Sequence, residues 1–223
     1  MQTHDTLTVI VFAKPPVEGR SKTRLAESVG AENASALAYA FLRDSLVQLE
    51  RFREFTAVLA TTEEWPHARF PLPLDIEVWQ QGPGDLGDRL ERMMFKALQR
   101  TQTAVALGAD TPGLPAKLVI EAVHSLQEND AVLGPSRDGG FYLLGLRRCP
   151  PGVFSELPWS AANTLEATSS RLKRYGLSLA RSSPWFDIDT VEDLQRLRSL
   201  LERGVIQAPE TAAVLERIGD LPA

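Results

Sequence analysis

The feature that most limits the fold of this chain is a repeated alternation of short apolar runs with stretches of helical periodicity. Most runs end in polar, Gly or Pro positions, and no Gly/Ser-rich linker or internal repeat interrupts the series. Strands that alternate with helices form parallel sheets through right-handed crossovers. We therefore predict an α/β fold with a mostly parallel central sheet flanked by helices on both faces. The runs are Leu7–Ala13, Thr56–Ala60, Ile76–Trp79, Ala104–Leu107, Ala131–Leu133, Phe141–Leu146 and Leu177–Ala180.

The length and composition of the chain suit one folded unit. It has 223 residues, of which 43% are hydrophobic, and this is within the range of one α/β sheet with its helices. Apolar residues at helical spacing predict a helix over Ala34–Leu49. We predict a single domain over residues 1–223, with a core over about 7–200 and an accessory helix over about 208–219.

Composition also excludes some classes of function. The formal net charge of -5 argues against general affinity for nucleic acid or for an anionic membrane surface. No apolar run is long enough to span a bilayer, and no secretory leader is visible. The lone Cys149 cannot form an internal disulfide, and its neighbours Pro150 and Pro151 predict a loop residue rather than a nucleophile. We expect a cytoplasmic protein.

A single carboxylate follows the apolar run at the centre of the chain. Asp110 comes directly after Gly108 and Ala109, and the Pro and Gly residues that follow end the strand and open a helix. Asp110 is therefore expected at the carboxyl end of a strand, where open α/β sheets bind ligands. The alternative is that Asp110 only caps the next helix.

The loop after the first run, KPPVEGRSKTR, concentrates positive charge on an acidic protein. Four cationic residues accompany one carboxylate, Glu18. Arg and Lys make charge-assisted hydrogen bonds to phosphate oxygens, and the amides at a helix start add to them, so the loop suits a diphosphate. Gly19 and Lys22 lack the spacing of a P-loop, which argues against an ATPase. The alternative is a solvated basic loop. The cations are Lys14, Arg20, Lys22 and Arg24.

A Gly-rich segment, GPGDLG, over residues 82–87 matches the G-x-G-x-x-G pattern of dinucleotide enzymes. The match falls in the third strand-to-helix connection rather than the first, and Pro83 and Asp85 are poor neighbours for a pyrophosphate. A loop that lets a base or ribose approach the backbone is the stronger interpretation, with Asp88 as a charge at the helix start and Arg89 free to reach a ligand.

Two further segments carry polar residues. GPSRDGGFYLLG predicts a tight hairpin turn at Asp138, before the Phe141–Leu146 strand, and the pair Arg137 and Asp138 could bind an acceptor. FDIDTVEDL predicts a capped helix start after Asp187 and Asp189, which alternation places on one side of the segment. Together with Asp110, Asp189 would suit Mg²⁺, which takes one or two protein carboxylates plus phosphate oxygens and water.

These motifs, FAKPPVEGRSKTRLA, QGPGDLGDRL, GADTPGLP, GPSRDGGFYLLGL and FDIDTVEDL, resemble those of the GT-A superfamily of nucleotide-diphospho-sugar transferases. The chain most resembles the glycosyltransferase-like family known as rSAM/selenodomain-associated transferase 1, a relative of phospholactate guanylyltransferase and the molybdenum-cofactor nucleotidyltransferases. The resemblance covers about residues 7–200 and implies a Rossmann-like GT-A fold. Where glycosyltransferases of this superfamily usually have D-x-D, this chain has Gly108-Ala109-Asp110, which resembles the nucleotidyltransferase arrangement.

The resemblance implies a transferase that uses a nucleotide sugar or nucleoside triphosphate, a divalent metal (Mg²⁺ or Mn²⁺) and a small acceptor. Alternatives are a nucleotidyltransferase acting on a small phosphorylated acceptor, a nicotinamide oxidoreductase, and a non-catalytic nucleotide-binding or partner module. The expected metal ligands are Asp110 and Asp189. The expected nucleotide-binding residues are Phe12, Ala13, Lys14, Arg20, Lys22, Arg24, Asp85, Gly87 and Asp88; the acceptor residues Arg137, Asp138, Gly139 and Gly140; and the catalytic residues Lys22, Arg24 and Asp138.

Overall fold

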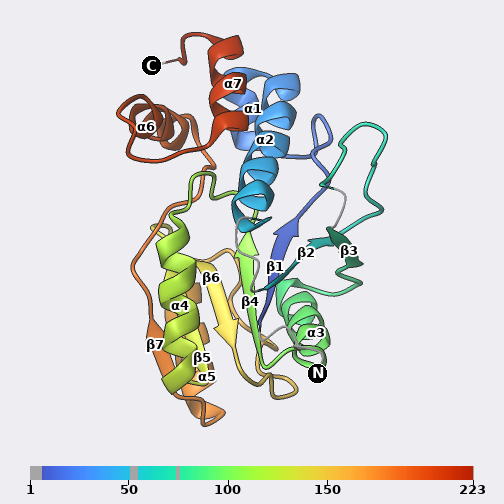
Figure 1. The fold of residues 1–223 in the computed structure, drawn as a ribbon, viewed down its shortest axis with the longest axis vertical. Coiled ribbons are helices and arrows are strands. Elements are labelled where there is room, and N and C mark those ends of the chain that lie inside the picture. Colours follow the sequence, from blue (N-terminus) through green and yellow to red (C-terminus); the bar gives the residue numbers. More distant parts are fainter. Residues whose placement is uncertain (1–6, 51–54, 74–75, 223) are drawn as a thin grey trace.

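The computed structural model describes residues 7–50, 55–73 and 76–222, and in this part of the chain one sheet lies between two layers of helices (Figure 1). Its strands lie in the order β3-β2-β1-β4-β6-β5-β7. Neighbouring strands are parallel except where β6 pairs with β4 and β5. The strands are β1 (Leu7–Ala13), β2 (Thr56–Thr61), β3 (Glu77–Gln80), β4 (Thr103–Gly108), β5 (Ala131–Pro135), β6 (Phe141–Leu146) and β7 (Leu179–Arg181).

Helices follow most of the strands, so the predicted α/β class and mostly parallel sheet are confirmed. No helix in the described ranges combines the length and the apolar character needed to cross a membrane. The helices are α1 (Thr23–Val29), α2 (Ala31–Glu50), α3 (Leu86–Leu98), α4 (Ala116–Glu128), α5 (Thr164–Arg174), α6 (Val191–Glu202) and α7 (Pro209–Ile218).

The central strand β1 reads as a nearly continuous apolar run because both faces of the sheet are covered at that point. Val9 and Val11 are fully buried on the face that packs against α2 and α4. Ile10, between them, is equally buried on the opposite face, against residues of α3. The alternation of side chains along a strand thus gives β1 a core on each side.

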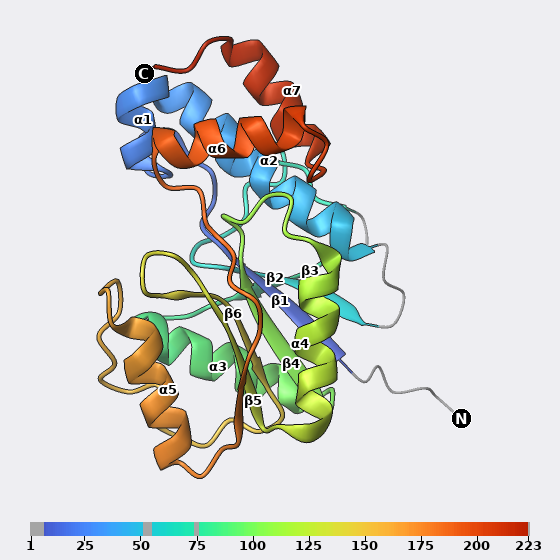
Figure 2. The ribbon, with the colours of Figure 1, turned by 90° about the vertical axis from the view of Figure 1, so that its left-hand side faces the viewer.

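A third apolar cluster lies beyond one end of the sheet, where α1, α2, α6 and α7 gather (Figure 2). Helix α2 belongs to two clusters, because Leu46 and Leu49 pack on the sheet while Leu37 and Phe41 pack among the helices. The 20-residue length of α2 spans both regions. This helix therefore fixes the helical end of the molecule on the sheet.

The predicted hairpin at Asp138 is present, because β5 and β6 pair antiparallel on either side of it. Gly139 has φ +89°, and a Cβ at this position would lie 2.0 Å from the carbonyl oxygen of Ala162. Only glycine fits both the left-handed backbone and the close approach. The turn is therefore packed directly against the loop that precedes α5.

The attachment of α7 depends on a buried carboxylate from another helix. Ala208, which precedes α7, supplies no side-chain cap. Asp44 of α2 replaces it and accepts hydrogen bonds from the backbone N–H of Glu210 (3.0 Å) and from the N–H and hydroxyl of Thr211 (2.9 and 2.6 Å). Asp44 is only 4% exposed. A carboxylate at a helix N-terminus satisfies free N–H groups and interacts favourably with the helix dipole.

We predict that Asp44→Ala lowers the free energy of unfolding by about 2–4 kcal/mol, because three donors, of which the two on Thr211 are buried, lose their acceptor. Urea denaturation followed by circular dichroism measures this. The matched control is Glu210→Ala, which removes an exposed ion pair with Arg43 (3.2 Å) between the same two helices and should cost less than about 1 kcal/mol. Equal losses in the two variants would show that Asp44 does not hold α7 in place.

Candidate functional site

The carboxyl ends of β1, β2, β3 and β4 meet around one cavity of about 370 Å³. The cavity lies where the chain order reverses direction, since β2 and β3 extend to one side of β1 and β4 lies on the other. Open α/β sheets bind ligands at this point. We call it the cationic cavity, because five cationic side chains and two carboxylates line it: Lys14, Arg20, Lys22, Arg24, Arg89, Asp110 and Asp189.

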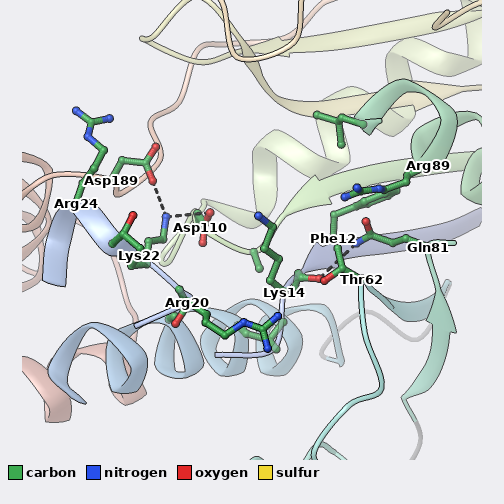
Figure 3. Close-up of a pocket in the computed structure, with 17 residues that line it drawn as sticks. Phe12, Lys14, Arg20, Lys22, Arg24, Thr62, Gln81, Arg89, Asp110 and Asp189 are labelled. Carbon is green, nitrogen blue, oxygen red and sulfur yellow. Dashed lines mark hydrogen bonds and ion pairs between the residues drawn. The ribbon is translucent and has the colours of Figure 1, made fainter. Parts of the chain in front are cut away.

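Lys22 forms the centre of the site, where its ammonium lies between two carboxylates (Figure 3). Its Nζ is 2.9 Å from Oδ2 of Asp110 and 2.7 Å from Oδ1 of Asp189. The Lys22 side chain is 6% exposed, whereas those of Asp110 and Asp189 are 49% and 44% exposed. A buried cation is thus held by two carboxylates that still face solvent.

Backbone contacts explain why these three segments meet. The N–H of Ala109 donates to Phe12 O (3.1 Å), so the turn after β4 follows the end of β1. The N–H of Ile188 donates to Asp110 O (3.0 Å), which brings the segment before α6 to the same turn. Asp110 is therefore held by its own backbone on both sides, and it does not cap α4, whose N-cap is Pro115.

The ends of two helices position the other members. Lys22 is the N-cap of α1 and has the left-handed conformation, with φ 49° and ψ 47°. Asp189 directly precedes the predicted capped start of α6, where Thr190 and Asp193 form a capping box. A non-glycine residue in the left-handed region is typical of a site whose surroundings fix the backbone.

The contact between Lys22 and Asp189 shifts the pKa values of these two groups so that both stay charged. Burial alone would lower the pKa of Lys22, but the adjacent carboxylates outweigh burial and hold it above 10.5. Burial alone would raise the pKa of Asp189, but Lys22 outweighs it and holds the pKa below 3.8. Asp187 makes no ion pair with Lys22, and burial together with the charge of Asp189 raises its pKa to about 6.

The other cations of the cavity differ in their availability. Lys14 is exposed and makes no ion pair within the described ranges, whereas Arg20 pairs with Glu63. Nε of Arg89 donates to the carbonyl of Gly84 (3.0 Å). Buried Gln81 lies near Arg89, as Figure 3 shows, and its side-chain amide donates to Ala60 O (2.8 Å). This end of the cavity is therefore rich in hydrogen-bonding groups.

The Gly-rich segment contributes Leu86 to the cavity, and Arg89 follows just beyond the segment, whereas the carboxylates of this region do not line the cavity. Asp85 and Asp88 form the capping box of α3, and Gly87 faces the backbone of Phe154, which a Cβ would approach to 2.4 Å. None of these three is among the residues that line the cationic cavity. Their predicted contact with a nucleotide stays a prediction, and the carboxylates already have partners in the helix.

A second cavity, of about 210 Å³, adjoins the first and shares Asp110 and Leu86 with it. We call it the anionic cavity, because the charged residues in its lining are Asp110, Asp138 and Asp187. Of the four predicted acceptor residues, Asp138 and Gly140 line it, and Arg137 and Gly139 do not. Asp187 and Asp189 thus line different cavities.

Asp110 and Asp189 could hold a divalent cation only together with ligands that the protein does not supply, such as phosphate oxygens. Within the described ranges, no group of three or more His, Cys, Asp or Glu side chains is arranged to hold a metal ion. Asp110 and Asp189 are hard oxygen donors that jointly hold the Lys22 ammonium. Mg²⁺ commonly uses one or two protein carboxylates and completes its shell with phosphate oxygens and water. The residues therefore fit a metal that arrives with a phosphate ligand.

Several residues that line the two cavities were not predicted from the sequence. Thr62 and Gln81 follow β2 and β3, so applying the strand-end rule beyond Asp110 would have found them. Trp159 and Thr164 line the anionic cavity from the loop before α5 and the start of that helix. No motif marks that loop in the sequence.

Cys149 lies in a loop, as predicted, and burial raises the pKa of its thiol to about 12.

We predict that Lys22→Met lowers the free energy of unfolding by about 1–2 kcal/mol at pH 7, because two carboxylates then face each other without a cation. The pKa of Asp189 is depressed, so its stabilisation is present above pH 3.8 and is lost as the pH falls through the lower, folded-state pKa. The difference between wild type and variant should therefore shrink below pH 3.8.

Urea denaturation at several pH values measures this difference. The matched control is Lys14→Met, which removes an exposed charge from the same cavity and should leave stability unchanged. A difference between wild type and Lys22→Met that persists undiminished at pH 2 would contradict the ion-pair account.

Comparisons with known structures agree with this architecture. A protein of Desulfovibrio desulfuricans G20, provisionally described as a nucleotide-diphospho-sugar transferase, is 30% identical over 96% of this chain and 95% of its own, with a TM-score of 0.86. A CMP:2-keto-3-deoxy-manno-octonic acid synthetase complexed with CTP is 14% identical (89% of this chain, 99% of that one; TM-score 0.58).

A third structure, 4-diphosphocytidyl-2C-methyl-D-erythritol synthase from Anaerococcus prevotii DSM 20548, is 13% identical over 90% of this chain and all of its own, with a TM-score of 0.57. The two more distant structures share the fold.

Comparison with curated proteins found no match. Residues 45–161 match the family described as "Uncharacterized protein conserved in bacteria (DUF2064)". The chain therefore belongs to the DUF2064 family, and it shares its nucleotidyltransferase-like fold with the D. desulfuricans protein.

Proposed function

We propose that this protein is a nucleotide-dependent transferase that takes a glycosyl group from a nucleotide sugar and passes it to a small acceptor. The observation that carries the proposal is the pair of adjoining cavities, one cationic and one anionic, that share Asp110. A transfer between two substrates needs two neighbouring subsites, and subsites of opposite charge suit an anionic donor and an uncharged or cationic acceptor. Asp110 lies at their boundary.

The cationic cavity suits the nucleotide. Its volume, about 370 Å³, is in the range of small-molecule sites. Lys14, Lys22 and Arg24 would neutralise the diphosphate, and charge-assisted hydrogen bonds of this kind are among the strongest in proteins. Phe12 and Gln81 would face the nucleoside at the other end of the cavity. Arg20 would contribute once it leaves Glu63.

A divalent metal, Mg²⁺ or Mn²⁺, would be held by Asp110 and Asp189 together with phosphate oxygens. When bound, it would supply positive charge for the diphosphate as the leaving group gains electrons. Lys22 and Arg24 act on the same charge from the protein side, since preorganised cations in a partly enclosed site stabilise developing negative charge without reorganisation.

The anionic cavity suits the acceptor. Asp138 has one carboxylate oxygen, Oδ1, engaged by the Ser136 hydroxyl and by the N–H of Gly140 (2.9 Å). Its second oxygen makes no hydrogen bond in the described part of the chain and would accept the proton of an acceptor hydroxyl. That hydroxyl oxygen bonds to the anomeric carbon of the donor as the bond from that carbon to the diphosphate oxygen breaks. The bonding pair leaves with the diphosphate.

Transfer of a nucleotidyl group is the second candidate. The single carboxylate in Gly108-Ala109-Asp110 favours it, as does the shared fold with two cytidylyl-type synthetases, one of them complexed with CTP. In that reaction the acceptor oxygen bonds to the α-phosphorus of a nucleoside triphosphate and pyrophosphate leaves. The D. desulfuricans protein, at 30% identity, supports the glycosyl reaction instead.

We predict that the protein binds at least one of the nucleoside diphosphates UDP, GDP, CDP and ADP. The affinity for this nucleotide should be higher in the presence of Mg²⁺ than in its absence. Asp110→Asn should weaken this binding by about 10- to 100-fold in the presence of Mg²⁺, because the metal loses a ligand, and much less in EDTA. Isothermal titration calorimetry measures both affinities.

The matched control is Asp220→Asn, the same chemical change on an exposed carboxylate outside both cavities. It should leave the affinities unchanged. Absence of binding by the wild type to every nucleotide would refute the proposed function. An Asp110→Asn variant that binds the nucleotide as tightly as the wild type in the presence of Mg²⁺ would instead refute the assigned role of Asp110. Nucleotide binding by both proteins, with no transfer catalysed by the wild type, would favour a non-catalytic module.

A further inference from the structure

The side chains that line the anionic cavity indicate which class of acceptor it would bind. Neither the fold nor the cationic cavity gives this indication. Three carboxylates belong to its lining, and no Lys, Arg or His side chain does. Asp110 is paired with Lys22, whereas Asp138 and Asp187 make no ion pair within the described ranges. The five cations of the site all line the adjoining cavity. Because like charges brought together in a partly enclosed space repel strongly, this lining disfavours a phosphorylated or carboxylated molecule.

The walls of the cavity are built rigidly. The hydroxyl of Thr164 lies within hydrogen-bond distance of the carbonyl oxygens of Pro158 (2.6 Å) and Ala161 (2.7 Å) and shares its single proton between them, which fixes the loop before α5. The N–H of Leu165 donates to Gly139 O (2.9 Å), which ties the first turn of α5 to the β5–β6 turn. Ser160 has a left-handed backbone, with φ 57°. Strain of this kind is found where a binding surface is held in place by its surroundings.

Two aromatic side chains give the cavity an apolar face. Phe141 and Trp159 are half-buried, and their rings meet edge to face with centroids 6.3 Å apart. Aromatic faces contact the C–H surface of a sugar ring or a cationic group, while carboxylates accept hydrogen bonds from hydroxyl or ammonium groups. A small pocket with an apolar wall and a few convergent polar groups is typical of a substrate site.

We infer that the acceptor is a neutral or cationic polyhydroxy compound, such as a sugar or an amino sugar, and not a phosphorylated one. This inference rests on the proposed function, because it takes the cationic cavity for the donor. It favours glycosyl transfer to a hydroxyl group over nucleotidyl transfer to a phosphate. It also assigns a role to Trp159 and Asp187, as residues that select the acceptor.

The test uses matched trios of a hexose, its 2-amino sugar and its 6-phosphate in the gluco, galacto and manno series. Each compound is titrated into wild-type protein that already holds Mg²⁺ and its preferred nucleoside diphosphate, at pH 8 and low salt. Binding is followed by NMR through the indole N–H signal of Trp159, assigned with Trp159→Phe. We expect a hexose or amino sugar to bind at least about tenfold more tightly than the corresponding 6-phosphate.

A second variant isolates the charge. Asp187→Asn should reduce the preference for the hexose or amino sugar over its 6-phosphate by about threefold or more. The affinity of this variant for the nucleotide should stay within twofold of the wild type. The control variant Asp220→Asn should alter neither the preference nor the nucleotide affinity. The inference is overturned if a 6-phosphate binds as tightly as its neutral and amino partners, or if no member of any trio binds the loaded protein. Failure of the nucleotide itself to bind would be a separate result, directed against the proposed function.

Discussion

The site depends on one interaction, the ammonium of Lys22 held between Asp110 and Asp189. It joins three segments that are far apart in the chain: the loop after β1, the turn after β4 and the start of α6. Lys22 is almost fully buried, so a buried charge without these partners would be costly. Each carboxylate keeps about half its surface exposed. The interaction therefore stabilises the fold at its ligand-binding edge and leaves acidic oxygen atoms available there.

The same interaction divides the surface into two regions of opposite character. The loop after β1 places its cations on one side of Asp110, and the β5–β6 turn and the segment before α6 place Asp138 and Asp187 on the other. Because β6 runs antiparallel to β4, its turn returns to the carboxyl edge of the parallel strands. The reversed strand thus brings the anionic cavity beside the cationic cavity.

Much of this fold could be predicted from the sequence, since each apolar run of the alternating series corresponds to a strand. β1 matches its predicted bounds, because a strand buried on both faces leaves a continuous apolar signature. β7 is displaced to Leu179–Arg181, because Leu177 is buried in the core without belonging to the strand. The start of α1 was not predicted, because Lys22 has a left-handed backbone at its N-cap, and intrinsic preferences disfavour that conformation for lysine.

The site was predictable in part. Asp110 could be located because strand ends bind ligands, but its contact with Lys22 depends on the register of segments nearly 90 residues apart, which no local pattern encodes. Asp187 and Asp189 were indistinguishable by alternation, and only the structure shows that Asp189 is the one that pairs with Lys22. Trp159 was missed because a lone tryptophan in a loop has no periodic context.

The most direct measurement of the central claim is a crystal structure of the protein with its preferred nucleoside diphosphate and Mn²⁺, with the ion located by its anomalous scattering. Our account predicts an anomalous peak beside the carboxylates of Asp110 and Asp189, with the diphosphate among the cations of the loop after β1 and the anionic cavity free of nucleotide. A nucleotide bound outside the cationic cavity, or an ion bound away from both carboxylates, would contradict it.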